Sequence, residues 1–108
     1  MAVKTDNVTA GKVLSATVQY DNSNDAQRAY DIKGEAYISN NAVQNVNNGY
    51  VYAKDSDVNA SYMASFSSYG DSNLSINFNT GDKAIVIAIT ESVVGFIEDV
   101  KKNVDSKN

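Results

Sequence analysis

The chain of 108 residues contains no cysteine, no histidine, no tryptophan and no proline. Without cysteine and histidine it has no disulfide framework, no zinc-binding set of side chains, no thiolate nucleophile and no imidazole general base. These absences exclude enzymes of the Ser-His-Asp and Cys-His classes. Paired carboxylates are then the only acid–base chemistry left. We therefore expect a protein that is not an enzyme and that binds no cofactor.

Two pairs of carboxylates lie close enough in the sequence to be considered as catalytic groups. Asp31 and Glu35 fall on one face of a predicted strand, about 13 Å apart at ~3.3 Å per residue. This separation exceeds the ~5–9.5 Å between the carboxylates of glycosidases. Asp55 and Asp57 fall in a polar loop. With no histidine to orient either pair, we interpret both as solvated surface groups and predict no catalytic residue.

Two acidic loops place oxygen-bearing side chains at alternate positions, as the first half of a calcium-binding loop does. They are residues 21–25 and 55–59. An EF-hand loop also needs glycine at its sixth position and glutamate at its twelfth, and neither loop has them. We therefore predict no metal site and interpret both segments as polar turns. An irregular loop stabilised by calcium is the alternative.

The charge balance and the distribution of apolar residues argue against nucleic-acid and membrane partners. Nine Lys and Arg face thirteen Asp and Glu, a formal net charge of −4, and the basic residues do not alternate with the tyrosines, which argues against nucleic acid. No apolar run approaches the ~20 residues of a membrane-spanning helix, so we expect no membrane insertion. Residues 1–25 lack the pattern of a signal peptide. The sequence favours a cytoplasmic location, and a secreted or virion-associated one stays open if a leader was removed.

The composition predicts a chain made mainly of strands. Thirteen Val, seven Ile and seven Tyr against two Leu suit a pleated, half-buried surface. Fourteen Asn and twelve Ser suit turns and outer strand faces. We predict a type I′ hairpin turn at Asn48-Gly49 and a tight turn at Asn40-Asn41. Strand-like alternation covers residues 13–20, 28–39, 42–47, 50–54, 61–66 and 74–79.

The C-terminal part changes from a strand pattern to a helix pattern. Residues 84–89 are apolar on both faces, which is typical of a strand in the middle of a sheet. From Thr90, a favourable N-cap, the apolar residues recur with helical period. The predicted helical stripe consists of Val93, Phe96, Ile97, Val100 and Val104.

These patterns predict an α+β fold. We expect an antiparallel meander of five to seven strands, forming a curled sheet or a small barrel, with one C-terminal helix packed on one face. Residues 1–108 form a single domain: a loose arm or edge strand at 1–12, the sheet at 13–89, the helix at 90–104 and a frayed tail at 105–108. A small sandwich with a helical appendage is the alternative.

One helix cannot cover both faces of such a sheet, so the second face is the best indication of function. Tyr37, Tyr50 and Tyr52 are predicted to lie on it, either as ordinary cover or as an interaction face, since tyrosine is enriched at interfaces. We expect a small non-catalytic binding or assembly module that acts through protein–protein contact and self-associates. The alternative is a small-ligand domain, for sugar or lipid, with a pocket in the curled sheet or on this tyrosine-rich face.

The predicted helix depends on one aromatic residue. Phe96 lies in the middle of its apolar stripe, so Phe96→Asp buries a charge in the core and should unfold the protein. Circular dichroism and thermal melting test this prediction. A soluble mutant that melts cooperatively would contradict the placement of Phe96.

Overall fold

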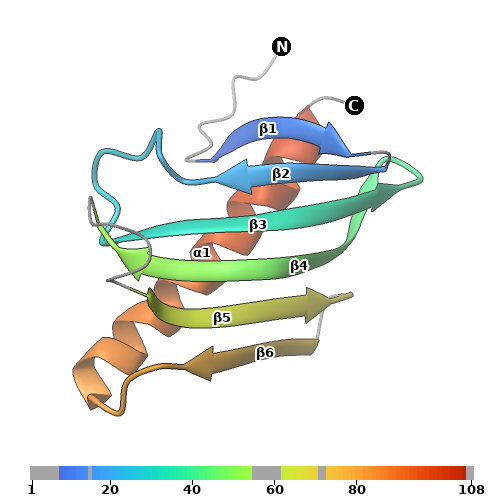
Figure 1. Ribbon diagram of the computed structural model, residues 1–108. Coiled ribbons are helices and arrows are strands. Elements are labelled where there is room, and N and C mark those ends of the chain that lie inside the picture. The colour runs from blue at the N-terminus through green and yellow to red at the C-terminus, as the bar shows by residue number, and fades with distance from the viewer. Residues whose placement is uncertain (1–7, 15, 55–61, 71–72, 107–108) are drawn as a thin grey trace.

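The computed structural model describes residues 8–14, 16–54, 62–70 and 73–106. Within them the chain forms one antiparallel sheet, with strands in sequence order, followed by one helix (Figure 1). The elements are β1 (Thr9–Leu14), β2 (Thr17–Asp21), β3 (Tyr30–Ser39), β4 (Ala42–Ala53), β5 (Tyr62–Tyr69), β6 (Asn73–Phe78) and α1 (Lys83–Ser106).

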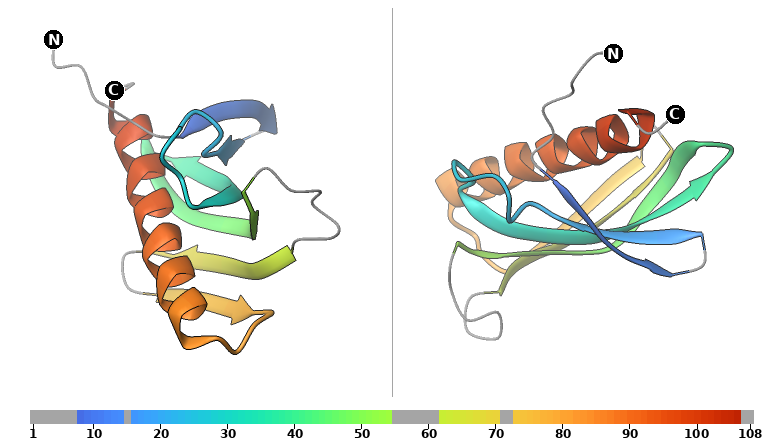
Figure 2. Two further views of the ribbon diagram at one scale, coloured as in Figure 1. Left: turned by 90° about the vertical axis from the view of Figure 1, so that its left-hand side faces the viewer. Right: turned by 90° about the horizontal axis from the view of Figure 1, so that it is seen from above.

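The fold is α+β, as predicted, and the sheet is not closed into a barrel. Helix α1 crosses one face of the sheet diagonally (Figures 1 and 2) and packs chiefly against β3 and β4. We call this covered side the inner face and the opposite side the outer face.

The hydrophobic core lies between the inner face and α1. The helical stripe predicted from the sequence is buried in full, as are the inward-facing residues Ile32 and Ala36 of β3. The buried core residues are Val8, Tyr20, Ile32, Ala36, Val46, Val51, Ala64, Phe66, Ile89, Val93, Phe96, Ile97, Val100 and Val104.

The strand predicted for residues 84–89 is wrong, because these residues form the first turns of α1. A strand that is apolar on both sides needs cover on both faces, and this sheet is covered on one. As a helix, the same residues extend the buried stripe backward through Ile85 and Ile89, while Ile87 faces outward with 49% of its surface exposed. Packing of one face thus overrides the strand propensity of a β-branched run.

The ends of the helix also differ from the prediction. Asp82 caps α1, since its Oδ1 accepts a hydrogen bond of 3.1 Å from the backbone N–H of Ile85. Thr90, the predicted N-cap, lies inside the helix and donates its hydroxyl proton to the carbonyl of Val86. Residues 105 and 106, predicted to fray, belong to the helix, and 107–108 lie outside the described residues.

The single strand predicted for residues 13–20 is two strands. Leu14 pairs with Thr17, so β1 and β2 form a tight hairpin, and residues 9–12 take the edge-strand alternative of the prediction. Ser15 and Ala16, which separate the two strands in the sequence, are not the Asn-Gly or Asp-Gly pair that marks a two-residue turn. The alternating pattern of residues 13–20 therefore does not indicate the turn between β1 and β2.

The two asparagine-rich turns predicted between residues 39 and 50 have different outcomes. Asn40 and Asn41 form the β3–β4 turn, with φ of 56° and 61°, the two positive values that a type I′ turn requires. The hairpin predicted at Asn48-Gly49 is wrong, because both residues lie inside β4. There they form part of a β-bulge, in which Asn48 has a φ of 50°.

The bulge in β4 changes which side chains face inward. Lys33 pairs with Tyr50 and Glu35 pairs with Asn47, so two steps along β3 match three along β4. Val46 and Val51 are five residues apart, yet both are buried on the inner face. One extra residue is what allows this, because side chains alternate with a period of two.

The bulge also places Gly49 under an aromatic ring. A Cβ atom at Gly49 would lie 2.5 Å from the ring of Phe66, so only glycine leaves room for this ring. Phe66 in turn meets Phe96 of α1 edge to face, with ring centroids 6.0 Å apart. Phe96 also lies near Gly34 of β3, where a Cβ would be 3.5 Å from its ring. The two rings therefore attach the helix to the middle of the sheet.

Two polar side chains hold the N-terminal strands. The buried Tyr20 donates its hydroxyl proton to Asn103 Oδ1 of α1 at 2.9 Å. Asn22, just after β2, accepts from the backbone N–H of Ile32 at 2.9 Å and donates to the carbonyl of Tyr30 at 2.8 Å. An asparagine side chain thereby continues the β2–β3 pairing beyond the end of β2.

Replacing Gly49 tests the close contact with Phe66. We expect Gly49→Ala to lower the free energy of unfolding by about 1–3 kcal/mol, since an extra methyl group in a packed core forces its neighbours apart. Urea unfolding measures this loss. Gly95→Ala is the matched control, because open space surrounds that position and alanine favours a helix. Equal stability of Gly49→Ala and the wild type would contradict the contact.

Candidate binding surface on the outer face

The outer face of the sheet is not covered by any element that the structure describes (Figure 2). Its side chains are mostly tyrosine, asparagine and serine rather than aliphatic residues. Tyrosines there are well exposed, up to 52% for Tyr69. This face therefore differs from the inner face both in its contacts and in its chemistry.

Three tyrosine rings gather near one end of β4 and β5. Tyr50 and Tyr52 lie two residues apart on one face of β4, with ring centroids at 6.4 Å, and Tyr62 of β5 lies 6.5 Å and 6.2 Å from them. The ammonium group of Lys33 lies 5.6 Å from the centre of the Tyr52 ring, in cation–π range. We call these three rings the tyrosine cluster.

The structure brings together two of the three tyrosines that the sequence singled out. Tyr50 and Tyr52 are in the cluster. Tyr37 is exposed but pairs with Asn45, whereas Lys33 pairs with Tyr50. Tyr37 thus lies four residues further along β3, about 13 Å at ~3.3 Å per residue, and is not part of the cluster.

Sequence reasoning missed Tyr62 because of a second bulge. Alternation grouped Tyr62 with Ala64 and Phe66, which are buried on the inner face. In the structure Val51 pairs with Ala64 and Tyr52 pairs with Tyr62. One extra residue in β5 therefore reverses the side of Tyr62, and no sequence signal marks this bulge.

Tyr69 was missed for a simpler reason. It lies on β5 in phase with Ser65 and Ser67, so alternation alone would have placed it on the outer face. The predicted strand ended at residue 66, whereas β5 continues to Tyr69.

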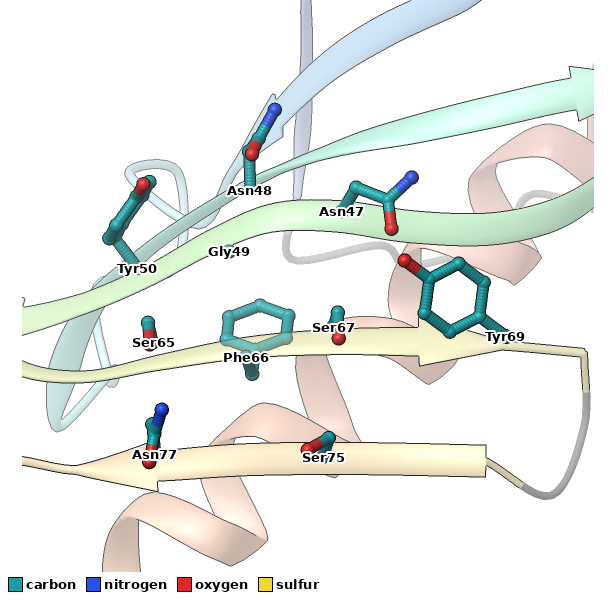
Figure 3. Close-up of a pocket in the computed structure, with 10 residues that line it drawn as sticks. All are labelled: Asn47, Asn48, Gly49, Tyr50, Ser65, Phe66, Ser67, Tyr69, Ser75 and Asn77. Atoms are coloured by element: carbon teal, nitrogen blue, oxygen red, sulfur yellow. The ribbon is translucent and has the colours of Figure 1, made fainter.

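A cavity of about 470 Å³ lies on the outer face beside the tyrosine cluster (Figure 3). We call it the trough. Its side chains come from the bulge of β4, from β5 and from β6, and none of them carries a charge. The lining residues are Asn47, Asn48, Gly49, Tyr50, Ser65, Phe66, Ser67, Tyr69, Ser75 and Asn77.

Because β4, β5 and β6 are paired, the residues that line the trough stand in rows across the three strands. Tyr50, Ser65 and Asn77 form one row across β4, β5 and β6, and Ser67 pairs with Ser75 in the next. Tyr50 lies at one end and Tyr69 at the other (Figure 3).

One buried polar atom in the trough has no hydrogen-bond partner. The amide nitrogen of Asn47 donates to Asn45 Oδ1 at 2.7 Å, but Asn47 Oδ1 is shielded from solvent and accepts no hydrogen bond. Its neighbour Asn48 donates to a carboxylate oxygen of Glu35 at 3.1 Å. The orphaned oxygen belongs to the residue that begins the bulge.

The acidic residues considered in the sequence have local partners. Asp21 Oδ1 accepts from the backbone N–H of Ser23, and Asp25 Oδ1 accepts from that of Gln27. Asp31 forms an ion pair with Arg28. The second calcium-loop candidate, 55–59, and the pair Asp55 and Asp57 lie outside the described residues. Among the residues described, no three acidic side chains are grouped to hold a metal ion.

A smaller cavity of about 240 Å³ lies at the other side of the molecule, between the β5–β6 end and α1. Leu74 and Val94 line it, and both are about 40% exposed. Since α1 crosses the sheet diagonally (Figure 1), this corner of the inner face is left partly open.

Comparison of the chain with protein-family models, with curated proteins and with solved structures finds no match. In the described part of the chain no helix is both long enough and apolar enough to cross a bilayer. The arrangement of residues on the outer face is therefore the basis for any functional inference.

Proposed function

We propose that the protein is a non-catalytic binding module and that the tyrosine cluster and the trough, which occupy the β4–β6 part of the outer face, are its binding surface. The observation that supports this most is the position of the exposed tyrosines. They gather on the face of the sheet opposite to the helix, so they do not contribute to the hydrophobic core between the sheet and the helix.

The chemistry of this face suits recognition. Tyrosine provides a large, rigid contact area at low entropic cost, while serine and asparagine provide adaptable hydrogen bonds, and antibody binding loops use the same residues. The mutual packing of Tyr50, Tyr52 and Tyr62 holds the rings in place before a partner arrives. Such preorganisation favours binding because less freedom is lost on association.

The trough offers little to a reaction. The trough contains amides, hydroxyls and aromatic rings but no carboxylate or ammonium group. Glu35 accepts a hydrogen bond from the lining residue Asn48 but does not itself line the trough. General acid–base chemistry needs a titratable group near the working pH, so binding is the better proposal.

A second candidate is self-association through the open corner of the inner face. Leu74 and Val94 are exposed aliphatic side chains that line the cavity at this corner. Exposed apolar groups of this kind are a common feature of protein–protein contacts. This candidate uses residues that are distinct from those of the outer face.

The outer-face proposal can be tested with a paired tyrosine variant. The wild type and Tyr50→Ala/Tyr62→Ala are screened against a phage-displayed peptide library and a glycan array. We expect ligands of the wild type to bind the variant about tenfold or more weakly, equivalent to ~1.4 kcal/mol. Tyr37→Ala is the matched control. Ligands that bind the wild type and the double variant equally would contradict the proposal.

Self-association has its own measurement. Sedimentation velocity over a range of protein concentrations should show a dimer that is lost in Leu74→Ser/Val94→Ser, and the melting temperature of the wild type should rise with concentration. A monomer at every concentration argues against this second candidate and leaves the outer-face proposal unaffected.

A further inference from the structure

We infer that the trough is a carbohydrate site that binds a short, neutral oligosaccharide lying along β4 and β5. This inference rests on the proposed function, since it names the ligand of the outer face. It is carried by the shape of the trough, by the side chains at its ends and between them, and by the orphaned oxygen of Asn47.

The trough has the size of a ligand site and an elongated outline. Its volume of about 470 Å³ falls within the ~300–1,000 Å³ of small-molecule sites. From Ser65, which pairs with Tyr50, to Tyr69 there are four residues of β5, or about 13 Å at ~3.3 Å per residue. This length exceeds that of one sugar ring and suits a short chain of them.

The two ends of the trough are aromatic. Tyr50 and Tyr69 are both partly exposed and stand at opposite ends (Figure 3). A sugar ring has an apolar side formed by its C–H groups, which packs on the face of an aromatic ring with weak C–H contacts. A tyrosine adds a hydroxyl group at the rim of that contact.

Between the tyrosines the lining consists of neutral hydrogen-bonding groups. Ser65, Ser67, Ser75 and Asn77 provide hydroxyls and an amide, groups that both donate and accept. Sugar hydroxyls do the same. Since no charged side chain lines the trough and the protein carries a net charge of −4, neutral sugars are favoured over acidic ones.

Asn47 provides an acceptor that needs a donor. A buried oxygen without a hydrogen bond destabilises the structure, and the amide nitrogen of the same side chain already donates to Asn45 Oδ1. A ligand hydroxyl is the donor that we infer. Asn47 lies at the Tyr69 end of the trough (Figure 3). Because its Oδ1 is shielded from solvent, neighbouring side chains must shift for the hydroxyl to reach this oxygen.

The lining fits other ligand classes less well. A lipid chain needs a predominantly apolar surface, and here Phe66 is the one wholly apolar side chain, with its ring on the inner side of the sheet. An extended peptide gains affinity by pairing with a free strand edge, whereas the trough is centred on β5, which is paired on both sides.

Calorimetric titration with defined oligosaccharides tests the inference. The full chain is titrated with cellohexaose, laminarihexaose, xylohexaose, mannohexaose, maltohexaose and chitohexaose, and with hexagalacturonate as the acidic comparator. We expect at least one neutral sugar to bind more tightly than hexagalacturonate. Chemical-shift changes in Ser65, Ser67, Ser75 and Asn77 should place it in the trough.

Variants of the trough separate the proposed contacts. Tyr69→Ala and Asn47→Ala should each weaken binding of that sugar about tenfold, which corresponds to ~1.4 kcal/mol. Tyr69→Phe, which keeps the ring, should stay within about threefold of the wild type, and Tyr37→Ala should not change binding. Circular dichroism and thermal melting confirm that each variant is folded.

Several outcomes would overturn the inference. They are no heat and no shift change with any neutral sugar at millimolar concentration, equal binding by the wild type, Tyr69→Ala and Asn47→Ala, or binding of hexagalacturonate as tight as that of the best neutral sugar. If instead peptides are selected and lost in Tyr50→Ala/Tyr62→Ala, the carbohydrate inference fails while the outer-face proposal stands.

Discussion

The contact on which the rest of the structure depends is the ring of Phe66 lying over Gly49 and against Phe96. It attaches α1 to the sheet, and it requires glycine to face inward at that point of β4. Gly49 faces inward because the bulge adds one residue to β4 between Val46 and Val51. Without that residue the alternation of side chains would reverse beyond the bulge. The packing of the core thus depends on an irregularity of the backbone.

The same irregularity determines the outer face. If β4 were regular, Tyr50 and Tyr52 would share a side with Val46 and would point toward the helix. The bulge turns both outward, and a second bulge in β5 turns Tyr62 outward beside them. The core therefore receives small and aliphatic residues at these positions while the tyrosines go to the opposite side. The bulges therefore determine both the packing of the inner face and the residues that lie on the outer face.

Much of the fold could be predicted from the sequence because most strands alternate regularly. The faces of β3 and the buried stripe of α1 follow directly from periods of two and 3.6. The errors have common causes: bulges shift the alternation without changing composition, as at Tyr62, and tertiary cover decides between helix and strand for an apolar run such as 84–89. The Asn48-Gly49 pair was predicted to form a hairpin turn because both residues tolerate a positive φ. A bulge also accommodates a residue with positive φ, so this pair does not distinguish a hairpin from a bulge. Of the candidate face, Tyr50 and Tyr52 could be grouped from sequence, whereas their partner Tyr62 and the trough could not.

The location of the trough follows from the bulge as well. In a regular antiparallel sheet the backbone groups of an inner strand pair alternately with its two neighbours, and the side chains stand in even rows. A bulge interrupts this order, increases the local twist and re-aims side chains, which is why bulges are frequent beside binding sites. Here residues 47–49 form one wall of the trough, and the side-chain oxygen of Asn47 lies there without a hydrogen-bond donor. Gly49 leaves room for the ring of Phe66 on the inner side and adjoins Tyr50 on the outer side, so this short segment contributes both to the packing of the core and to the proposed binding surface.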